Sequence, residues 1–293
     1  MPFHQLVIEL PGRELAPAED ACRRLGAMAV TLADAGDEPL LEPAPGETPL
    51  WQSVRLRAIF PVSIEPKIAA ATLEAVLGLP PGAIGIEFLA DRAWEREWLK
   101  DFRPMRFGRQ LWVCPAGQRP ATRAAVVLEL DPGLAFGTGT HPTTALCLEW
   151  LDGAIRGGEH VLDYGCGSGI LALAALKLGA GCATAFDIDP QALRATRENA
   201  AKNGLADRIF IPVSAADIAG RFDVVLANIL SGPLIGLAPE LSARAEPGGQ
   251  LVLAGLLSPQ AGEVAQAYRP WFDIGPAAER EGWILLAGRR RVE

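Results

Sequence analysis

The feature that most constrains this chain is a strand, a glycine-rich turn and a helix that follow one another from residue 161. An apolar run ends at Asp163, and three glycines follow at alternate positions: Gly165, Gly167 and Gly169. Residues 170–178 then have the pattern of a helix that ends at Gly179. Glycine permits backbone angles that a Cβ forbids and lets a ligand lie against the backbone. We therefore expect a ligand-binding turn at the positive end of a helix dipole, where N–H groups are free.

The spacing of the glycines indicates which kind of ligand the turn holds. A dinucleotide fold has the pattern G-x-G-x-x-G, whereas position 170 of this chain is isoleucine. An acidic residue followed by G-x-G-x-G resembles motif I of the class I S-adenosylmethionine-dependent methyltransferases. The motif alone is also compatible with an ordinary tight turn between a strand and a helix.

Two acidic residues follow the next buried strand, which we expect at residues 182–186. Asp187 lies 24 residues after Asp163, the length of one strand–helix–strand unit. A carboxylate at this strand end can accept hydrogen bonds from both ribose hydroxyls of an adenosine ligand. Asp189 precedes Pro190 and is typical of a helix N-cap. We therefore assign Asp187 to the ribose and Asp189 to the cap.

The segment 131–144 is rich in glycine and is expected to form an irregular loop before a helix that begins at Pro142. It is not a phosphate-binding P-loop, because no lysine follows its glycines. Thr144 places a hydroxyl in the first turn of the helix, within reach of a ligand or of the backbone. His141 is a candidate general base, but a lone histidine beside proline is more often bonded to the backbone.

Asn228 ends another buried strand, expected at residues 222–227. Ligands of a doubly wound sheet bind beyond the carboxyl ends of its strands, so Asn228 is expected to face the reactive end of a cofactor. Asp217 is positioned to meet an adenine amino group, or is a loop acid. Further strands are expected at 208–213 and 251–256, a helix at 261–268, and a terminal hairpin formed by 272–274 and 283–287.

The first part of the chain has a different pattern. Strands are expected at 4–10, 27–32, 53–60 and 84–89, and helices at 17–25 and 68–77. This β-α-β-β-α-β order is typical of a ferredoxin-like domain. A loop is expected at 34–50, and a charged helix at 91–102, where Trp94, Trp98 and Phe102 form one apolar stripe.

Composition excludes several classes of protein. The 293 residues are 49% hydrophobic and 21% charged, which suffices for a folded core. A formal net charge of −8 argues against a direct nucleic-acid binder. The five cysteines form no C-x-x-C pair, so we expect neither a disulfide framework nor a metal site. No secretory signal and no membrane-spanning run is visible, and we expect a cytoplasmic protein.

Taken together, the motifs at 131–144, 163–169, 187–190 and 228–230 resemble the bacterial ribosomal protein L-eleven methyltransferases. The resemblance covers nearly the whole chain, and the segment 133–144 is its most specific part. It implies an α/β fold: a doubly wound, mostly parallel seven-stranded class I methyltransferase sheet, preceded by a smaller α+β ferredoxin-like domain. It implies a substrate-recognition domain at 1–96, a linker at 97–118 and a methyltransferase domain at 119–293.

The resemblance also implies a function. S-adenosylmethionine donates methyl groups to lysine side chains and to the N-terminal amine of the ribosomal protein. The residues implied or expected to contact the cofactor are Thr144, Asp163, Gly165, Gly167, Gly169, Asp187 and Asn228. Asn228 is also expected to orient the acceptor amine without a general base, with Phe136 and Leu230 in the substrate pocket. A monomer without nucleic-acid or membrane partners is expected.

Three alternatives stay open at the level of sequence. A nucleotide-dependent oxidoreductase would need glycine at position 170. A non-catalytic ribosome-associated protein would tolerate loss of the cofactor loop. A methyltransferase that acts on another protein or on a small molecule is compatible with the same motifs.

Overall fold

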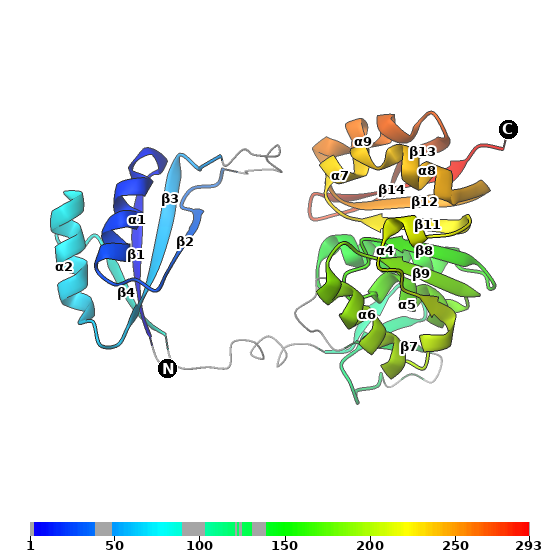
Figure 1. Cartoon of the computed structure of the whole chain (residues 1–293), viewed down its shortest axis with the longest axis horizontal. Helices are drawn as coiled ribbons and strands as arrows, with labels where there is room; N and C mark the ends of the chain where they lie inside the picture. Colours follow the sequence, from blue (N-terminus) through cyan, green and yellow to red (C-terminus); the bar gives the residue numbers. More distant parts are fainter. Residues whose placement is uncertain are drawn as a thin grey trace. The chain divides into compact units, whose positions relative to one another are not determined.

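The computed structural model describes residues 3–38, 49–89, 103–120, 122, 125–130 and 139–292. The chain divides into two compact units, Met1–Trp98 and Leu99–Glu293 (Figure 1). Three features expected from the sequence lie wholly or largely outside the described residues: the loop at 34–50, the helix at 91–102 and the segment 131–138, which contains Phe136.

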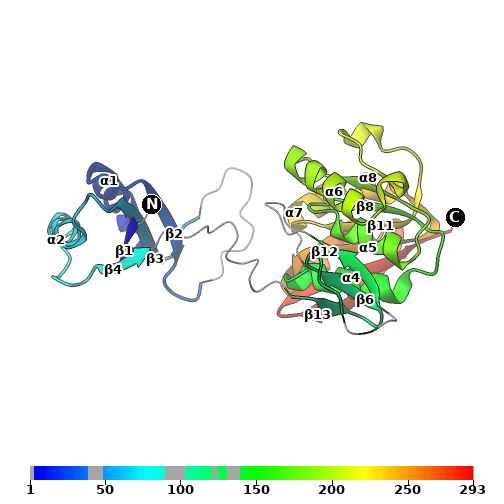
Figure 2. The ribbon, with the colours of Figure 1, turned by 90° about the horizontal axis from the view of Figure 1, so that it is seen from below.

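The first unit is a four-stranded antiparallel sheet with two helices on one face (Figure 2). Its main elements are β1 (Phe3–Pro11), α1 (Leu15–Arg24), β2 (Ala29–Asp34), β3 (Ser53–Pro61), α2 (Pro66–Leu77) and β4 (Gly85–Leu89). The strand order β2-β3-β1-β4 is the ferredoxin-like arrangement that the sequence predicts. Val54, Leu56 and Ala58 of β3 are fully buried, because the two-residue period of a strand turns all three toward the helices.

The second unit is built on a seven-stranded sheet with the order β10-β9-β8-β11-β12-β14-β13. Its strands are β8 (His160–Tyr164), β9 (Cys182–Phe186), β10 (Ile209–Phe210), β11 (Phe222–Asn228), β12 (Ala245–Leu257), β13 (Phe272–Arg280) and β14 (Trp283–Arg290). The strands from β8 to β12 are parallel, and β14 is antiparallel to both of its neighbours. This is the doubly wound, mostly parallel sheet expected from the sequence.

Helices cover both faces of this sheet (Figure 2). One core is formed with α4 (Pro142–Ala154), α5 (Ile170–Leu178) and α6 (Pro190–Lys202), and the other with α7 (Ser231–Gly236), α8 (Ala238–Arg244) and α9 (Ala261–Tyr268). Val161 and Leu162 are both fully buried, one in each core, so β8 is apolar on both faces, as parallel central strands usually are. The predicted bounds of β9, α5 and α9 match those observed.

A small sheet of β5 (Met105–Phe107), β6 (Leu111–Cys114) and β7 (Val126–Glu129) packs against α4 and α5. The carboxylate of Asp152 in α4 accepts hydrogen bonds from the backbone N–H groups of Arg109, Gln110 and Leu111, at 2.6, 3.2 and 3.0 Å. The predicted linker at 97–118 therefore differs from the structure, because two of its segments are strands of the second unit.

Two further differences have local causes. The strand expected at 208–213 is reduced to Ile209–Phe210, and Pro212, which has no N–H for a strand ladder, follows it closely. Helices α7 and α8 occupy a segment for which the sequence predicted no element. Among the described residues, no helix has the length and apolar character needed to cross a bilayer.

Candidate functional site

The glycine turn lies at the carboxyl end of β8 and is hydrogen-bonded to the end of β9. The backbone N–H groups of Gly165 and Cys166 both donate to the carbonyl oxygen of Phe186, at 2.8 and 3.0 Å. The N–H of Gly167 donates to Asp187 Oδ2 at 2.9 Å. The protein itself uses these amides of the turn, and in the first turn of α5 the N–H of Ala172 donates to Asp163 Oδ2. The turn is consequently not a cradle of amides for a phosphate.

The glycines are required by the backbone and also by close packing. Gly165, Gly167 and Gly169 all have positive φ, at 84°, 53° and 79°. A Cβ on Gly165 would lie 2.3 Å from Ile229 Cγ2, and one on Gly169 would lie 2.6 Å from Thr196 Cγ2. The structure therefore confirms that glycine is needed here, and it adds that neighbouring side chains impose part of this need.

Asp187 connects the turn to the next helix. Its Oδ1 accepts from the N–H of Asp189 at 2.9 Å, while Oδ2 holds Gly167. Each carboxylate oxygen has a second lone pair, so both can still accept from a ligand hydroxyl. Asp189 is the N-cap of α6, as predicted, and accepts from the N–H of Gln191 at 2.8 Å. The side chain of Ile188 between them is 90% exposed, an apolar surface that the sequence analysis did not single out.

Asp163 lies below the turn and has no exposed surface. Its Oδ2 accepts from the N–H of Ala172 in α5 at 3.1 Å, and its Oδ1 has no hydrogen-bond partner among the residues that the structure describes. Burial raises the pKa of this carboxyl to about 7, and the nearby charge of Asp187 adds to the rise, against the hydrogen bond from Ala172. The buried position supports a role in holding the turn from below.

Thr144 and Asn228 come together although 84 residues separate them in the chain. Thr144 is buried in the first turn of α4, and Asn228 ends β11. Asn228 Nδ2 lies 3.4 Å from Thr144 Oγ1 in hydrogen-bond geometry. This contact directs the amide of Asn228, so its oxygen faces away from the threonine hydroxyl.

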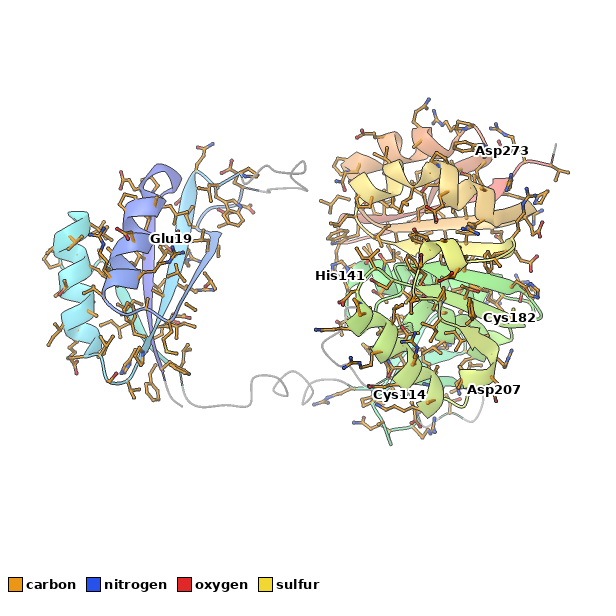
Figure 3. The ribbon with its side chains drawn as sticks, in the orientation of Figure 1. Glu19, Cys114, His141, Cys182, Asp207 and Asp273 are labelled. Atoms are coloured by element: carbon orange, nitrogen blue, oxygen red, sulfur yellow. The ribbon has the colours of Figure 1, made fainter. Side chains whose placement is uncertain are left out.

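His141 is the N-cap of α4 and stands at one edge of the second unit (Figure 3). Its Nδ1 accepts from the N–H of Thr143 at 3.3 Å, which confirms the predicted bond to the backbone. Its ring meets the ring of Trp283 edge-on, with centroids 4.8 Å apart. Burial lowers the pKa of His141, and the charge of Glu281 opposes this effect.

A cavity of about 430 Å³ opens beside Asn228. It is lined by His141, Thr143, Asn228, Ile229, Leu230, Gly255 and Trp283. The lining includes Leu230, which we predicted for the substrate pocket, and it adds Gly255 and Trp283, which the sequence did not single out. Phe136 is outside the described residues.

Gly255 allows β12 to come very close to the end of β11. It has a φ of 87°, and a Cβ there would lie 2.3 Å from the carbonyl oxygen of Ile229. The pairing of β12 with β14 is also shifted between Leu253 and Leu256. One wall of the cavity is therefore backbone packed against backbone. A lone glycine inside a predicted strand was the only sequence signal for this contact.

Comparisons with known proteins decide the family. The model of the family "Ribosomal protein L11 methyltransferase (PrmA)" matches residues 2–291. The chain belongs to the ribosomal protein L11 methyltransferase family. A relative of that name from Pseudomonas aeruginosa (strain LESB58) is 50% identical over 294 residues, covering 100% of both chains. Another, from Azotobacter vinelandii, is 48% identical over 292 residues, covering 99% of this chain and 100% of its own.

A solved structure supports the same assignment. The ribosomal protein L11 methylase from Lactobacillus delbrueckii subsp. bulgaricus is 35% identical, with a TM-score of 0.60. It covers 65% of this chain and 100% of its own length. The edge of the sheet that carries the glycine turn, Asp187 and Asn228 is therefore the candidate active site of a methyltransferase.

Proposed function

We propose that this methyltransferase transfers methyl groups from S-adenosylmethionine to amines of ribosomal protein L11, at lysine side chains and at the N-terminus. The observation that carries the proposal is that the glycine turn and the apolar cavity lie side by side. Ile229 belongs to both, since it packs against Gly165 and lines the cavity. A donor held at the turn can thus face an acceptor held in the cavity.

The residues at the turn fit the chemistry of S-adenosylmethionine. Asp187 offers two carboxylate oxygens with spare lone pairs to ribose hydroxyls, and exposed Ile188 offers an apolar surface to a flat base. Thr144, Asn228 and the turn glycines Gly165, Gly167 and Gly169 complete the proposed contacts, and Asp163 supports them from below. When bound, the sulfonium supplies an already activated methyl group.

The residues of the cavity act on the acceptor amine. A lysine amine with a pKa of about 10.4 is protonated at neutral pH, and only the neutral form has a lone pair for methyl transfer. The apolar lining from Ile229, Leu230 and Trp283 favours the neutral form, because it cannot solvate an ammonium ion. We assign orientation of the amine to the side-chain oxygen of Asn228, a role supported by the contact that Thr144 makes with the amide nitrogen.

The first unit is proposed to recognise the protein substrate. Its ferredoxin-like sheet has one face buried against α1 and α2, and we propose that the opposite face contacts the substrate. We further propose that the enzyme acts as a cytoplasmic monomer that does not bind nucleic acid directly, in keeping with its net charge of −8.

Mass spectrometry of purified ribosomal protein L11, after incubation with the enzyme and S-adenosylmethionine, tests the proposal. We expect mass additions in steps of one methylene group, mapped to lysine side chains and to the N-terminus. An enzyme that binds S-adenosylmethionine in a calorimetric titration but leaves the protein unmodified would have a different acceptor, to be sought among other proteins and small amines.

A further inference from the structure

The turn between β13 and β14 holds a backbone conformation that its first residue disfavours. Glu281 has a φ of 52°, and no other non-glycine residue in the described part of the chain has a positive φ. Glu281 and Gly282 form the two-residue loop between the paired Arg280 and Trp283. Such loops favour glycine, which has no Cβ to approach a carbonyl oxygen, and asparagine or aspartate, whose short polar side chains can hydrogen-bond locally. Asparagine or glycine at position 281 would relieve this backbone strain. The presence of glutamate instead points to a function for its side chain.

The turn is fixed beside the cavity by contacts on both of its arms. Trp283 lines the cavity and packs edge-on against His141, with ring centroids 4.8 Å apart. Arg280 Nη2 donates to both carboxylate oxygens of Glu149 in α4, at 3.0 and 3.1 Å. The backbone N–H of Ser258 donates to the carbonyl oxygen of Gly282 at 2.9 Å. His141 and Glu149 belong to α4 and its N-cap, and Ser258 directly follows β12, so the turn is held from two sides at the rim of the cavity.

The charges on this turn do not cancel. Arg280 is balanced by Glu149. Glu279 accepts a hydrogen bond from the neutral hydroxyl of Ser258 at 2.8 Å, a partner that carries no balancing charge. Glu281 is exposed and forms no ion pair or side-chain hydrogen bond within the described residues. Its negative charge raises the pKa of His141, so its field reaches the lining of the cavity.

We propose that the carboxylate of Glu281 recognises the cationic form of the acceptor amine at the rim of the cavity and delivers it to the apolar interior. This inference rests on the proposed function, because it concerns the acceptor of the same reaction. A carboxylate at the rim attracts an ammonium ion from solution. Deeper in the cavity, a carboxylate would instead hold the proton on the amine and suppress methyl transfer. The apolar lining beyond Trp283 keeps the carboxylate, which attracts the ammonium ion, apart from the interior, where the neutral amine reacts. The ammonium ion releases its proton to solvent as it enters the cavity.

Steady-state methylation of purified ribosomal protein L11 tests this role with three variants. Glu281→Asn removes the charge and relieves the backbone strain, because Asn-Gly is the favoured pair in this kind of loop. We expect its KM for the protein to rise about tenfold at low salt and its kcat to stay within about twofold. Its Tm should equal or exceed that of the wild type. Its KM should also depend less on salt than the KM of the wild type.

Two matched variants complete the experiment. Glu281→Asp keeps the charge and tolerates positive φ, so it should retain most of the wild-type KM. Glu263→Gln on α9 also removes one exposed acid, and it should leave KM unchanged. An unaltered KM and an unaltered salt dependence in Glu281→Asn would overturn the inference, as would a loss confined to kcat. Failure of the wild-type enzyme to methylate the protein would instead count against the proposed function, and this is measured first.

Discussion

The glycine turn at residues 163–169 and the cavity beside Asn228 adjoin each other but use their polar groups differently. In the turn, the amides of Gly165, Cys166 and Gly167 are all bonded to the end of β9. In the cavity, the lining is mostly apolar. In the proposed function this difference separates two tasks, since the rigid turn would hold the polar donor and the apolar cavity would accept the amine in its neutral form.

The largest expected effect concerns the carboxyl group below the turn. In the folded protein the pKa of Asp163 is raised to about 7, so it holds a proton over a pH range in which the unfolded chain, with its usual value of 3.8, has lost it. The stability that the protonated carboxyl of Asp163 contributes is therefore fully present below about pH 4 and is lost as the pH rises through about 7. A difference of about 3 pKa units corresponds to a free energy on the order of 4 kcal/mol.

Asp163→Asn should remove this dependence, because an amide does not titrate in this range. Urea unfolding from about pH 4 to about pH 8 should show the variant gaining stability relative to the wild type by up to about 4 kcal/mol. Asp217→Asn, which changes an exposed acid, serves as the control. Parallel stability profiles for Asp163→Asn and the wild type would show that the carboxyl is already ionised in the folded protein.

Gly169→Ala is expected to cause the next largest loss of stability, because it disturbs the packing of the turn. The new methyl group would lie 2.6 Å from Thr196 Cγ2 at a φ of 79°, so strain and overpacking together should cost about 3 kcal/mol. Gly204→Ala is a matched control, with a φ of 66° and nothing within 4 Å, and should cost about 1 kcal/mol. Equal losses in urea unfolding would mean that packing against Thr196 adds nothing.

Asp187→Asn separates donor binding from folding. The amide nitrogen of asparagine cannot accept from Gly167 or from a ribose hydroxyl, so we expect the Kd for S-adenosylmethionine to rise about 30-fold, or about 2 kcal/mol. Calorimetric titration measures this change. Asp189→Ala removes only the N-cap of α6 and should cost about 1 kcal/mol of stability with little change in Kd. An unchanged Kd in Asp187→Asn would remove the carboxylate from the proposed ribose contact.

The smallest effect is expected on the cavity side. Asn228→Ala should lower kcat for methylation about tenfold, or about 1.4 kcal/mol, because the amine loses the group that orients it. The Tm should change little, since within the described part of the chain the side-chain amide of Asn228 makes one long hydrogen bond, 3.4 Å from Thr144 Oγ1. Turnover equal to that of the wild type on the protein substrate would assign orientation of the amine to another residue.

Local sequence signals predicted the turn side of the site well. The helix at 170–178 and the strand at 182–186 have the predicted bounds, because an apolar run with a terminal glycine is a strong signal. The N-cap role of Asp189 also followed from its position before Pro190. The ferredoxin-like order of the first unit was predictable because its short apolar segments alternate with helices.

The cavity side was only partly predictable, because its residues come from four distant segments. Asn228 and Leu230 belong to one recognisable motif, whereas Trp283 joins them only through the pairing of β14 with β12. Helices α7 and α8 were missed because proline and glycine within 231–244 suggest a loop. Burial of Leu234 and Leu241 in the core outweighs that local preference.

The close contact of Gly255 with Ile229 also bears on how this enzyme family can acquire new acceptors. No side chain can be added at Gly255 without displacing the backbone of its neighbour, so that wall is inaccessible to mutation. With the acceptor in this cavity, as proposed, we expect changes in acceptor preference to arise at the side-chain walls, at Leu230 and Trp283 above all. A library built for laboratory evolution should vary these two positions first and keep Gly255 constant.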